Sequence, residues 1–245
     1  MLMKGRLTIN NSVCGRWLFS LFTMLLVSVG MQAGNYGITV AGVEVTDANA
    51  GNVLGDNITA GTVSFNPQTS TLTLNNVSMN GNVVSSLAAL NVKLVGVSTF
   101  NIDNSDGNYH YLFYSNNSSA TLTFSADELG ATLQGYGTTI NYKLDLKYWF
   151  NVTYDNIDYW SSTTTQMDDK DYCQVSKPYV IVDGSAINDA NKNNPDISGV
   201  SFDLTNNKVT LSGFQRENQT YNSYSLITSN IANLNVDIQI GRAHV

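Results

Sequence analysis

Three aromatic residues in the middle of the chain have the types and spacing that bind sugars. They are Trp149, Tyr159 and Trp160, in a stretch that also contains several other tyrosines. Flat aromatic rings bind the apolar faces of sugars, while nearby Asn, Asp and Lys side chains hydrogen-bond to the hydroxyl groups. We therefore predict that these three residues contact a glycan. The alternative for Trp149 is packing against a neighbouring repeat of the chain.

Carboxylates gather in the segment that follows. Asp168, Asp169 and Asp171 concentrate oxygen atoms in a predicted loop, and oxygen is the ligand that calcium prefers. The segment Asp103–Gly107 is similar, although neither segment has the spacing of a defined calcium loop. We keep calcium at Asp168, Asp169 and Asp171 as a hypothesis beside the simpler interpretation, a solvated acidic turn. No other cofactor is predicted.

Residues with catalytic chemistry are few. His110 lies among aromatic residues, without the Gly-x-Ser-x-Gly motif or an acidic partner typical of a hydrolase. Cys173 has no histidine nearby in the sequence. Asp127 and Glu128 are adjacent, so in a strand they would point to opposite faces and could not act as a pair. We predict no catalytic residue and a protein that is not an enzyme.

The elements that must position these residues are strands. Apolar and polar residues alternate in short runs, and no long amphipathic helix is indicated beyond the first 33 residues. Such alternation, bounded by Asn, Gly, Asp and Ser, is typical of half-buried β-strands. The runs include the pairs Ile38/Val40, Val43/Val45, Val63/Phe65, Leu72/Leu74, Val92/Leu94, Leu122/Phe124, Val180/Val182, Val209/Leu211 and Val236/Ile238. The sequence therefore predicts an all-β protein.

The longest alternation runs from Ile140 to Tyr154. Its even positions are aromatic or aliphatic and its odd positions are polar, with Trp149 as the exception. Because successive strand residues point to opposite faces, we expect Tyr148, Phe150 and Tyr154 in the core and Trp149 on the polar face. Strands rarely continue straight for about fifteen residues, so a bend is also expected here.

Three blocks of sequence occur twice in the same order. The pairs are Thr46–Asn49 with Asn188–Asn191, Val63–Leu74 with Val200–Leu211, and Leu90–Leu94 with Leu234–Ile238. Self-similarity of this kind is typical of modular, array-like proteins. Within the second pair, 66–69 and 203–207 are predicted hairpin turns, since proline presets φ and Asn and Asp tolerate unusual backbone angles.

The N-terminal residues have the layout of a secretory signal peptide. Lys4, Arg6 and Arg16 precede an apolar run, Trp17–Val29, and Ala33 occupies a plausible cleavage position. The apolar run is short for a membrane span, which needs about 20 residues. We predict that residues 1–33 are removed, that the protein is secreted or displayed at the cell surface, and that the mature chain has no membrane span.

The C-terminal residues are predicted to be an artefact. Ile240–Val245 is the translation of ATC GGA AGA GCA CAC GTC, a common sequencing adapter, and it interrupts the second copy of the repeat. The interpretation is a metagenomic gene fragment. Arg242 and His244 therefore support no functional argument.

Charge excludes one class of partner. Without Lys4, Arg6, Arg16 and Arg242, 8 basic residues face 19 acidic ones, a formal net charge of −11. A surface this acidic repels phosphate backbones, so nucleic-acid binding is not expected. A single cysteine, Cys173, offers no internal disulfide, so burial and hydrogen bonds must hold the fold.

The first repeat carries a resemblance to a known type of module. Its characteristic stretches are Tyr36–Thr46, Val53–Asp56, Gly61–Pro67 and Thr71–Val77. They resemble a module that recurs in secreted and surface proteins of gut anaerobes, Bacteroides-like and Clostridium-like, where parallel β-helix coils usually follow and some relatives are described as carbohydrate-binding. The resemblance implies a β-solenoid, parallel β-helix-like, with an antiparallel hairpin at the start of each module. It supplies no binding residues.

The resemblance is most specific over residues 36–96, weaker over 97–135, and returns in degraded form over 179–238. Residues 140–177 match nothing in it. The predicted organisation is a first module at 34–139, an aromatic-rich β connector at 140–177 and a truncated second module at 178–239. The alternating runs also fit antiparallel β-sandwich modules, which remain the alternative fold.

The functional prediction is a secreted or cell-surface, non-enzymatic β-repeat protein that binds a polysaccharide or a host or matrix glycan, or is adhesive. One alternative is a structural stalk that carries another domain. The other is a polysaccharide lyase or hydrolase on a β-helix, which rests on fold analogy alone.

Overall fold

The protein is all-β, as predicted. A computed structural model describes residues 34–140, 143–155, 161–167, 170–195, 197–214 and 226–239, with the backbone alone for 161–163 and 165–167. Strands joined by turns account for the regular structure in these ranges, and none of them contains a helix able to cross a membrane. The predicted signal peptide and Ile240–Val245 lie outside the described residues.

The strands are short, as expected from runs of alternating residues bounded by Gly, Asn and Ser. They are β1 (Asn35–Val40), β2 (Val43–Thr46), β3 (Ile58–Asn66), β4 (Thr71–Asn80), β5 (Val83–Ser85), β6 (Ala89–Val95), β7 (Val97–Ile102), β8 (His110–Ser115), β9 (Ala120–Ala126), β10 (Thr132–Gly137), β11 (Leu144–Tyr148), β12 (Phe150–Tyr154), β13 (Ser161–Met167), β14 (Lys170–Ser176), β15 (Val180–Val182), β16 (Ser185–Ile187), β17 (Val200–Asp203), β18 (Lys208–Ser212), β19 (Ile227–Ser229) and β20 (Asn235–Gln239).

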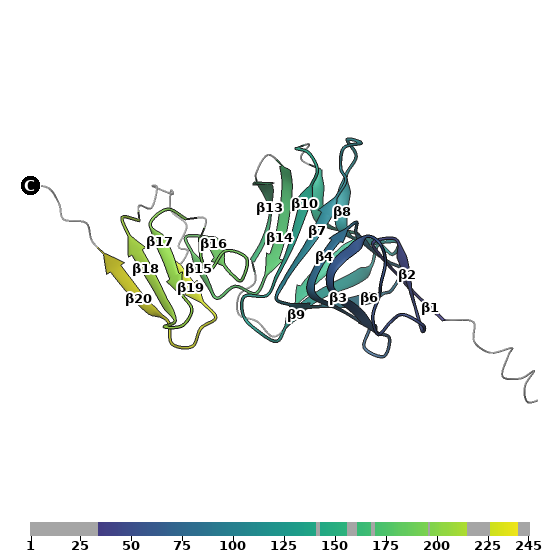
Figure 1. Ribbon diagram of the computed structural model, residues 1–245, viewed down its shortest axis with the longest axis horizontal. Coiled ribbons are helices and arrows are strands. Elements are labelled where there is room, and N and C mark those ends of the chain that lie inside the picture. The colour runs from purple at the N-terminus through teal and green to yellow at the C-terminus, as the bar shows by residue number, and fades with distance from the viewer. Residues whose placement is uncertain are drawn as a thin grey trace, which may run out of the picture. The chain divides into compact units, whose positions relative to one another are not determined.

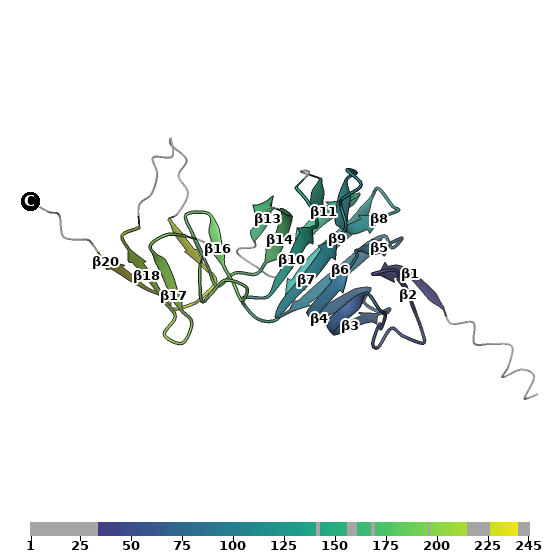
Figure 2. The same cartoon turned by 45° about the horizontal axis from the view of Figure 1, so that its top comes forward.

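Two mixed sheets form the larger part of the structure (Figures 1 and 2). One has the order β11-β8-β5-β1-β2, and the other, which curls, has the order β12-β9-β6-β4-β7-β10-β14-β13 with β3 beside β4. Two three-stranded sheets follow, β16-β15-β19 and β17-β18-β20.

The central strands of the larger part pair in three parallel ladders. The first ladder runs from β4 through β6 and β9 to β12, the second from the end of β4 through β7 to β10, and the third from β5 through β8 to β11. The chain visits the ladders in the same order each time, so each passage lies on the one before. Residues far apart in sequence are thereby stacked.

Stacking brings the inward-facing residues of successive strands together. Val92 is aligned with Leu72 on one side and with Phe124 on the other, and all three are fully buried. Phe113 packs against Phe100 and Phe124 with ring centroids 5.9 and 5.6 Å apart. Burial of such side chains contributes about 1.5–3 kcal/mol each and explains how the fold holds without a disulfide.

Each of the two predicted modules contains an antiparallel hairpin at a turn that the sequence predicted. In the first, β3 pairs β4 through the predicted 66–69 turn, where the Asn66 side chain accepts a hydrogen bond from the Gln68 N–H at 3.0 Å. In the second, β17 pairs β18, and Asp203 accepts a bond from the Asn206 N–H at 3.1 Å. Both predicted turns are confirmed, and Asx hydrogen bonding closes both.

The same pairing pattern surrounds both hairpins. The β1–β2 hairpin pairs β5 as the β15–β16 hairpin pairs β19, in each case antiparallel. Likewise β4 pairs β6 in parallel, with Leu72 opposite Val92, and β18 pairs β20 in parallel, with Val209 opposite Val236. The matched sequence blocks therefore occupy matching hydrogen-bond registers.

The alternating run 140–154 differs from its prediction. Its described residues form two strands, β11 and β12, which belong to different sheets and meet at Trp149. Phe150 is buried as expected, but Tyr148 is half-buried and Tyr154 is 40% exposed, so their assignment to the core was wrong. The backbone turns a corner at Trp149, and alternation does not specify the same interior on both sides of a corner.

Strands of the predicted connector are hydrogen-bonded to strands of the first module. The parallel ladders include β11 and β12, and β14 pairs antiparallel with β10. The proposed domain boundaries themselves stay a prediction.

Candidate functional site

Four aromatic side chains form a continuous contact on β8 and at the end of β11. Tyr148 is stacked on Tyr114 with centroids 5.3 Å apart and planes 13° from parallel, and on Trp149 at 5.0 Å and 19°. Tyr111 packs against Tyr148 at 4.8 Å. We call Tyr111, Tyr114, Tyr148 and Trp149 the aromatic stack.

Parallel pairing of β8 with β11 builds this stack. The register aligns Tyr114 with Tyr148 and Tyr111 with Asp145. Phe113 and Ser115, which flank Tyr114 in the chain, are buried, so Tyr114 points to the outer face of the sheet. The three tyrosines of the stack are half-buried and Trp149 is exposed, so solvent reaches the stack, and the exposed Asp145 is aligned with Tyr111.

Trp149 has an unusual backbone conformation. Its φ is +57°, in the left-handed region, and its side chain is 46% exposed. A bulky residue in this region costs about 1–2 kcal/mol, and such strain collects at functional sites. The prediction that Trp149 leaves the apolar face is confirmed, and the left-handed corner is the physical cause.

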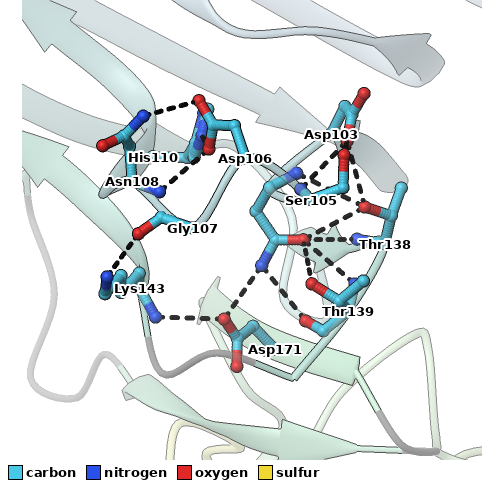
Figure 3. Close-up of polar contacts among 11 residues, drawn as sticks. Asp103, Ser105, Asp106, Gly107, Asn108, His110, Thr138, Thr139, Lys143 and Asp171 are labelled. Carbon is cyan, nitrogen blue, oxygen red and sulfur yellow. Dashed lines mark hydrogen bonds and ion pairs between the residues drawn. The ribbon is translucent and has the colours of Figure 1, made fainter.

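A buried polar network fixes the starts of β8 and β11 (Figure 3). Asn104, which is fully buried, accepts hydrogen bonds from the N–H groups of Thr138 and Thr139 at 2.8 and 3.0 Å. Its amide donates to Asp171 at 2.9 Å, and the same Asp171 oxygen accepts the Lys143 N–H at 3.0 Å. The network positions Lys143, the residue before β11. The His110 N–H, at the start of β8, then bonds to the Lys143 carbonyl at 2.7 Å.

The loop before β8 is held by a second set of contacts (Figure 3). Asp106 bonds to the His110 ring at 2.7 Å and accepts the Asn108 N–H at 2.9 Å. Hydrogen bonds from His110 and Asn108 hold the pKa of Asp106 well below its usual range. The Lys143 ammonium donates to the Gly107 carbonyl and lies 5.8 Å from the centre of the Tyr109 ring. These contacts tie the loop to the start of β11.

Charge and burial also act on the stack itself. Burial, together with the nearby Tyr148 and Asp145, raises the pKa of Tyr111. Tyr111 therefore stays neutral and keeps its hydroxyl hydrogen as a donor over the physiological pH range. The stack thus combines ring surfaces with a hydroxyl donor and, at Asp145, a carboxylate acceptor.

The predicted calcium ligands are only partly described. Asp171 is 2% exposed, and its carboxylate accepts hydrogen bonds from the Asn104 amide and the Lys143 N–H. These two bonds hold the side chain within the fold. Asp168 and Asp169 lie outside the described residues. Within the part of the chain that the structure describes, no group of three or more His, Cys, Asp or Glu side chains is arranged to hold a metal ion. Calcium at these residues stays a prediction.

Two further residues were considered for chemistry, and for His110 the sequence analysis missed an acidic partner, Asp106, four residues away in the sequence. The His110 ring is bonded to Asp106 as described, and Cys173 is fully buried. Burial raises the pKa of the Cys173 thiol, which keeps it protonated and unreactive. Tyr159 and Trp160, predicted beside Trp149 as glycan contacts, lie outside the described residues.

A small cavity of about 80 Å³ is lined by the carboxylates Asp127, Glu128 and Asp189. Asp127 forms an ion pair with Lys93 at 2.6 Å, and Asp189 accepts bonds from the Tyr179 hydroxyl and the Lys192 ammonium at 2.7 Å each. Ligand pockets commonly exceed about 300 Å³. This cavity is therefore a weaker candidate than the aromatic stack.

Sequence reasoning identified one of the four residues of the stack, Trp149, and assigned Tyr148 to the core. Tyr111 and Tyr114 lie in the aromatic run around His110. Of this run, the sequence analysis considered His110 alone, and for catalysis. Their approach to Tyr148 depends on parallel pairing between β8 and β11, which no local pattern specifies. The run of aromatic residues at 109–114 was the available signal.

No protein-family model, curated protein or solved structure matches the chain.

Proposed function

We propose that this protein binds a glycan through the aromatic stack and has no catalytic activity of its own. The single observation that carries the proposal is the half-exposed ring of Trp149. The backbone of Trp149 is in the strained left-handed conformation, at the corner between β11 and β12. Tyr148 covers one face of this ring by stacking. The ring's outward part then supplies an apolar platform for the C–H face of a sugar.

Polar groups around the platform suit hydroxyl recognition. Asp145 is exposed beside Tyr111, and its side chain is within 3.5 Å of the Thr164 hydroxyl. Carboxylate and hydroxyl groups at the rim of an aromatic surface fix the orientation of a sugar, while the rings contribute contact area. Tyr111 and Asp145 would thus determine which hydroxyl arrangement binds.

We also propose that the fold is a β-solenoid of the parallel β-helix type. The three parallel ladders, visited in a constant order, support it, and so do the antiparallel hairpins β1–β2 and β15–β16 at the module starts. A sandwich of stacked sheets remains the alternative. In either architecture, export to the cell surface would give the aromatic stack access to extracellular polysaccharide or host glycan.

The test is retention of the purified chain on a broad panel of immobilised polysaccharides. We expect binding to at least one, and we expect Trp149→Ala to weaken that binding at least tenfold, which corresponds to about 1.4 kcal/mol. Alanine keeps the Cβ that strains a left-handed residue, so this strain stays, and the stability cost of the variant is the lost ring contact with Tyr148, about 0.5–1.5 kcal/mol.

A matched control is Tyr154→Ala. Tyr154 is also an exposed aromatic residue, at 40%, but it lies on β12 in the other large sheet. It should leave retention unchanged. If the two variants behave alike, or if no glycan on the panel is retained, the aromatic stack is not a glycan site and the alternative of a structural stalk gains support.

A further inference from the structure

A second exposed aromatic ring lies beyond the aromatic stack. Tyr109 comes directly before β8 and is 65% exposed, compared with 46% for Trp149. The Lys143 ammonium lies over the Tyr109 ring, 5.8 Å from its centre, where a cation is attracted to the ring face. The large exposed fraction shows that much of the remaining ring surface is open to solvent.

The loop that carries Tyr109 is held on both sides of this residue (Figure 3). Asn108 and His110, its two neighbours in the chain, are both bonded to Asp106, through the Asn108 N–H at 2.9 Å and the His110 ring at 2.7 Å. A ring presented by a fixed loop loses less conformational freedom when a ligand binds than a ring on a loose one. Tyr109 is therefore pre-ordered for contact with a ligand.

Tyr109 adjoins the aromatic stack through Tyr111. The two residues are two positions apart at the start of β8, where alternate side chains point the same way. Burial raises the pKa of Tyr111, and the nearby Tyr148, Asp145 and Tyr109 raise it further, so all three lie near its hydroxyl group. We call Tyr109 together with the aromatic stack the aromatic row.

The two most exposed rings of the aromatic row lie at its opposite ends. Tyr109 is level with Lys143 at the start of the parallel pairing between β8 and β11. Trp149 follows Lys143 by six residues, and a strand rises about 3.3 Å per residue, so the two rings are about 20 Å apart along β11. One sugar ring cannot reach both ends, whereas a chain of linked sugars can.

Hydrogen-bonding groups lie between the two ends of the row. The three tyrosines of the stack are half-buried, and Tyr148 is stacked between Tyr114 and Trp149, so little of its ring faces remains for a ligand. Such tyrosines can offer ring edges and hydroxyl groups, and the exposed Asp145 adds a carboxylate beside Tyr111. The row thus combines an exposed ring at each end with polar groups that suit sugar hydroxyls in between.

We propose that the ligand is a linear polysaccharide chain that runs along β8 and β11, with one sugar unit against Trp149 and another, several units away, against Tyr109. This inference rests on the proposed glycan binding at the aromatic stack and adds the length and direction of the ligand. A chain already bound at Trp149 meets Tyr109 without a second loss of translational freedom, so the second contact strengthens binding. A disaccharide reaches one ring only.

The test is the dependence of affinity on chain length, measured by isothermal titration calorimetry with the full chain. The probes are size-fractionated oligosaccharides of cellulose, chitin, xylan and mannan, from disaccharide to octasaccharide. We expect at least one series to bind, with an affinity that rises at least tenfold once the oligosaccharide spans both rings.

Two outcomes would overturn the linear-chain proposal. Equal affinity at all lengths, with Trp149→Ala still weakening it, overturns this proposal and leaves the proposed glycan binding intact. Binding in no series also overturns it, and retention on the polysaccharide panel then decides separately whether the proposed glycan binding stands.

Variants locate the second contact. Tyr109→Ala should remove the gain in affinity for the longer oligosaccharides and change disaccharide affinity less than twofold, because the disaccharide is held at Trp149. Tyr109→Phe keeps the ring and should retain most of the gain. Tyr154→Ala is the matched control, an exposed aromatic residue on β12, and should change neither affinity. If Tyr109→Ala affects short and long oligosaccharides equally, or affects neither, Tyr109 is not a separate contact and the proposal fails.

Discussion

In the first module β6 lies between β4 and β9, whereas in the second module its counterpart β20 has β18 as its one described neighbour. Hydrogen bonds match at Asn91, in β6, and Asn235, at the start of β20, because the backbone N–H and the side-chain amide of each donate to carbonyls of the turn before β4 or β18. Burial does not match, since Val92 is fully buried and Val236 is 45% exposed. The comparison shows that alternation in a sequence defines a face of a strand, while the neighbouring strand decides whether that face is buried.

The largest expected effect comes from one substitution made at both positions. Val92→Asn should destabilise the protein by about 4 kcal/mol, because it leaves a cavity and buries an amide between β4 and β9. Val236→Asn should change stability by no more than about 0.5 kcal/mol, since an exposed site loses little burial. Differential scanning calorimetry of the two variants measures the contrast.

A similar loss of stability in both variants would contradict the unequal burial of the two strands. The conservative pair Val92→Ala and Val236→Ala serves as the control. It removes apolar volume without adding a polar group. Comparison with the asparagine variants therefore separates the free-energy cost of the cavity from the cost of burying an amide.

An intermediate loss of stability is expected when a turn contact that occurs in both modules is removed. The loss should be equal in the two modules. Asn49 accepts the Thr46 N–H at 2.7 Å and donates to the Glu44 carbonyl at 2.8 Å. Asn191 makes the same two bonds, with the Asn188 N–H and the Ala186 carbonyl, both at 2.9 Å. Asn49→Ala and Asn191→Ala should each cost about 2 kcal/mol, as two hydrogen bonds are lost.

Chemical denaturation of these two variants measures the cost. Asp substitutions at the same positions provide a control, because a carboxylate keeps the acceptor but removes the donor, and about half of the loss should then remain. A cost at only one of the two positions would show that the matching bonds do not carry matching energies.

The smallest effect is a pH dependence that the β17–β18 turn should show and the equivalent β3–β4 turn should not. Hydrogen bonds from the Asn206 side chain and N–H hold the pKa of Asp203 below its usual value of 3.8, whereas Asn66 closes the equivalent turn of the first module without a titrating group. Because the folded-state pKa is lowered, Asp203 stabilises the fold above its unfolded pKa, and this contribution disappears as the pH falls through the folded value.

Carboxyl NMR titration should place the Asp203 pKa below 3.8, and Asp203→Asn should remove its share of the acid destabilisation. A pKa at or above the usual value would show that the turn does not hold the carboxylate. The loss of stability belongs to the acidic range, below about pH 4.

Much of the fold could be predicted from local pattern. Alternating residues such as Leu72 and Leu74 specified strands, and the turns at 66–69 and 203–207 specified hairpins, because these elements depend on neighbours in sequence. The parallel ladders could not be obtained in this way. Pairing of β6 with β9 joins residues separated by a whole passage of the chain, and no turn chemistry records it.

The candidate site was predicted in part. Trp149 was identified because it breaks the alternation of its strand, and its exposure is confirmed. Tyr148 was assigned to the core, although it is half-buried and stacks between Tyr114 and Trp149. The error arose because a left-handed residue ends β11, and the alternation of residue types continues across that corner while the sheet does not.

The sequence by itself determined the strands, the hairpin turns and the matched blocks of this protein, since each follows from side-chain chemistry within a few residues. Tertiary structure alone decided which strand faces are covered and which rings meet. Val92 and Val236 have the same identity and the same local frame, yet opposite burial, and Tyr111 and Tyr148 meet through a register between distant strands. The physical reason is that burial and cross-strand contacts depend on which strands pair, whereas the alternation of residue types is a property of a single strand.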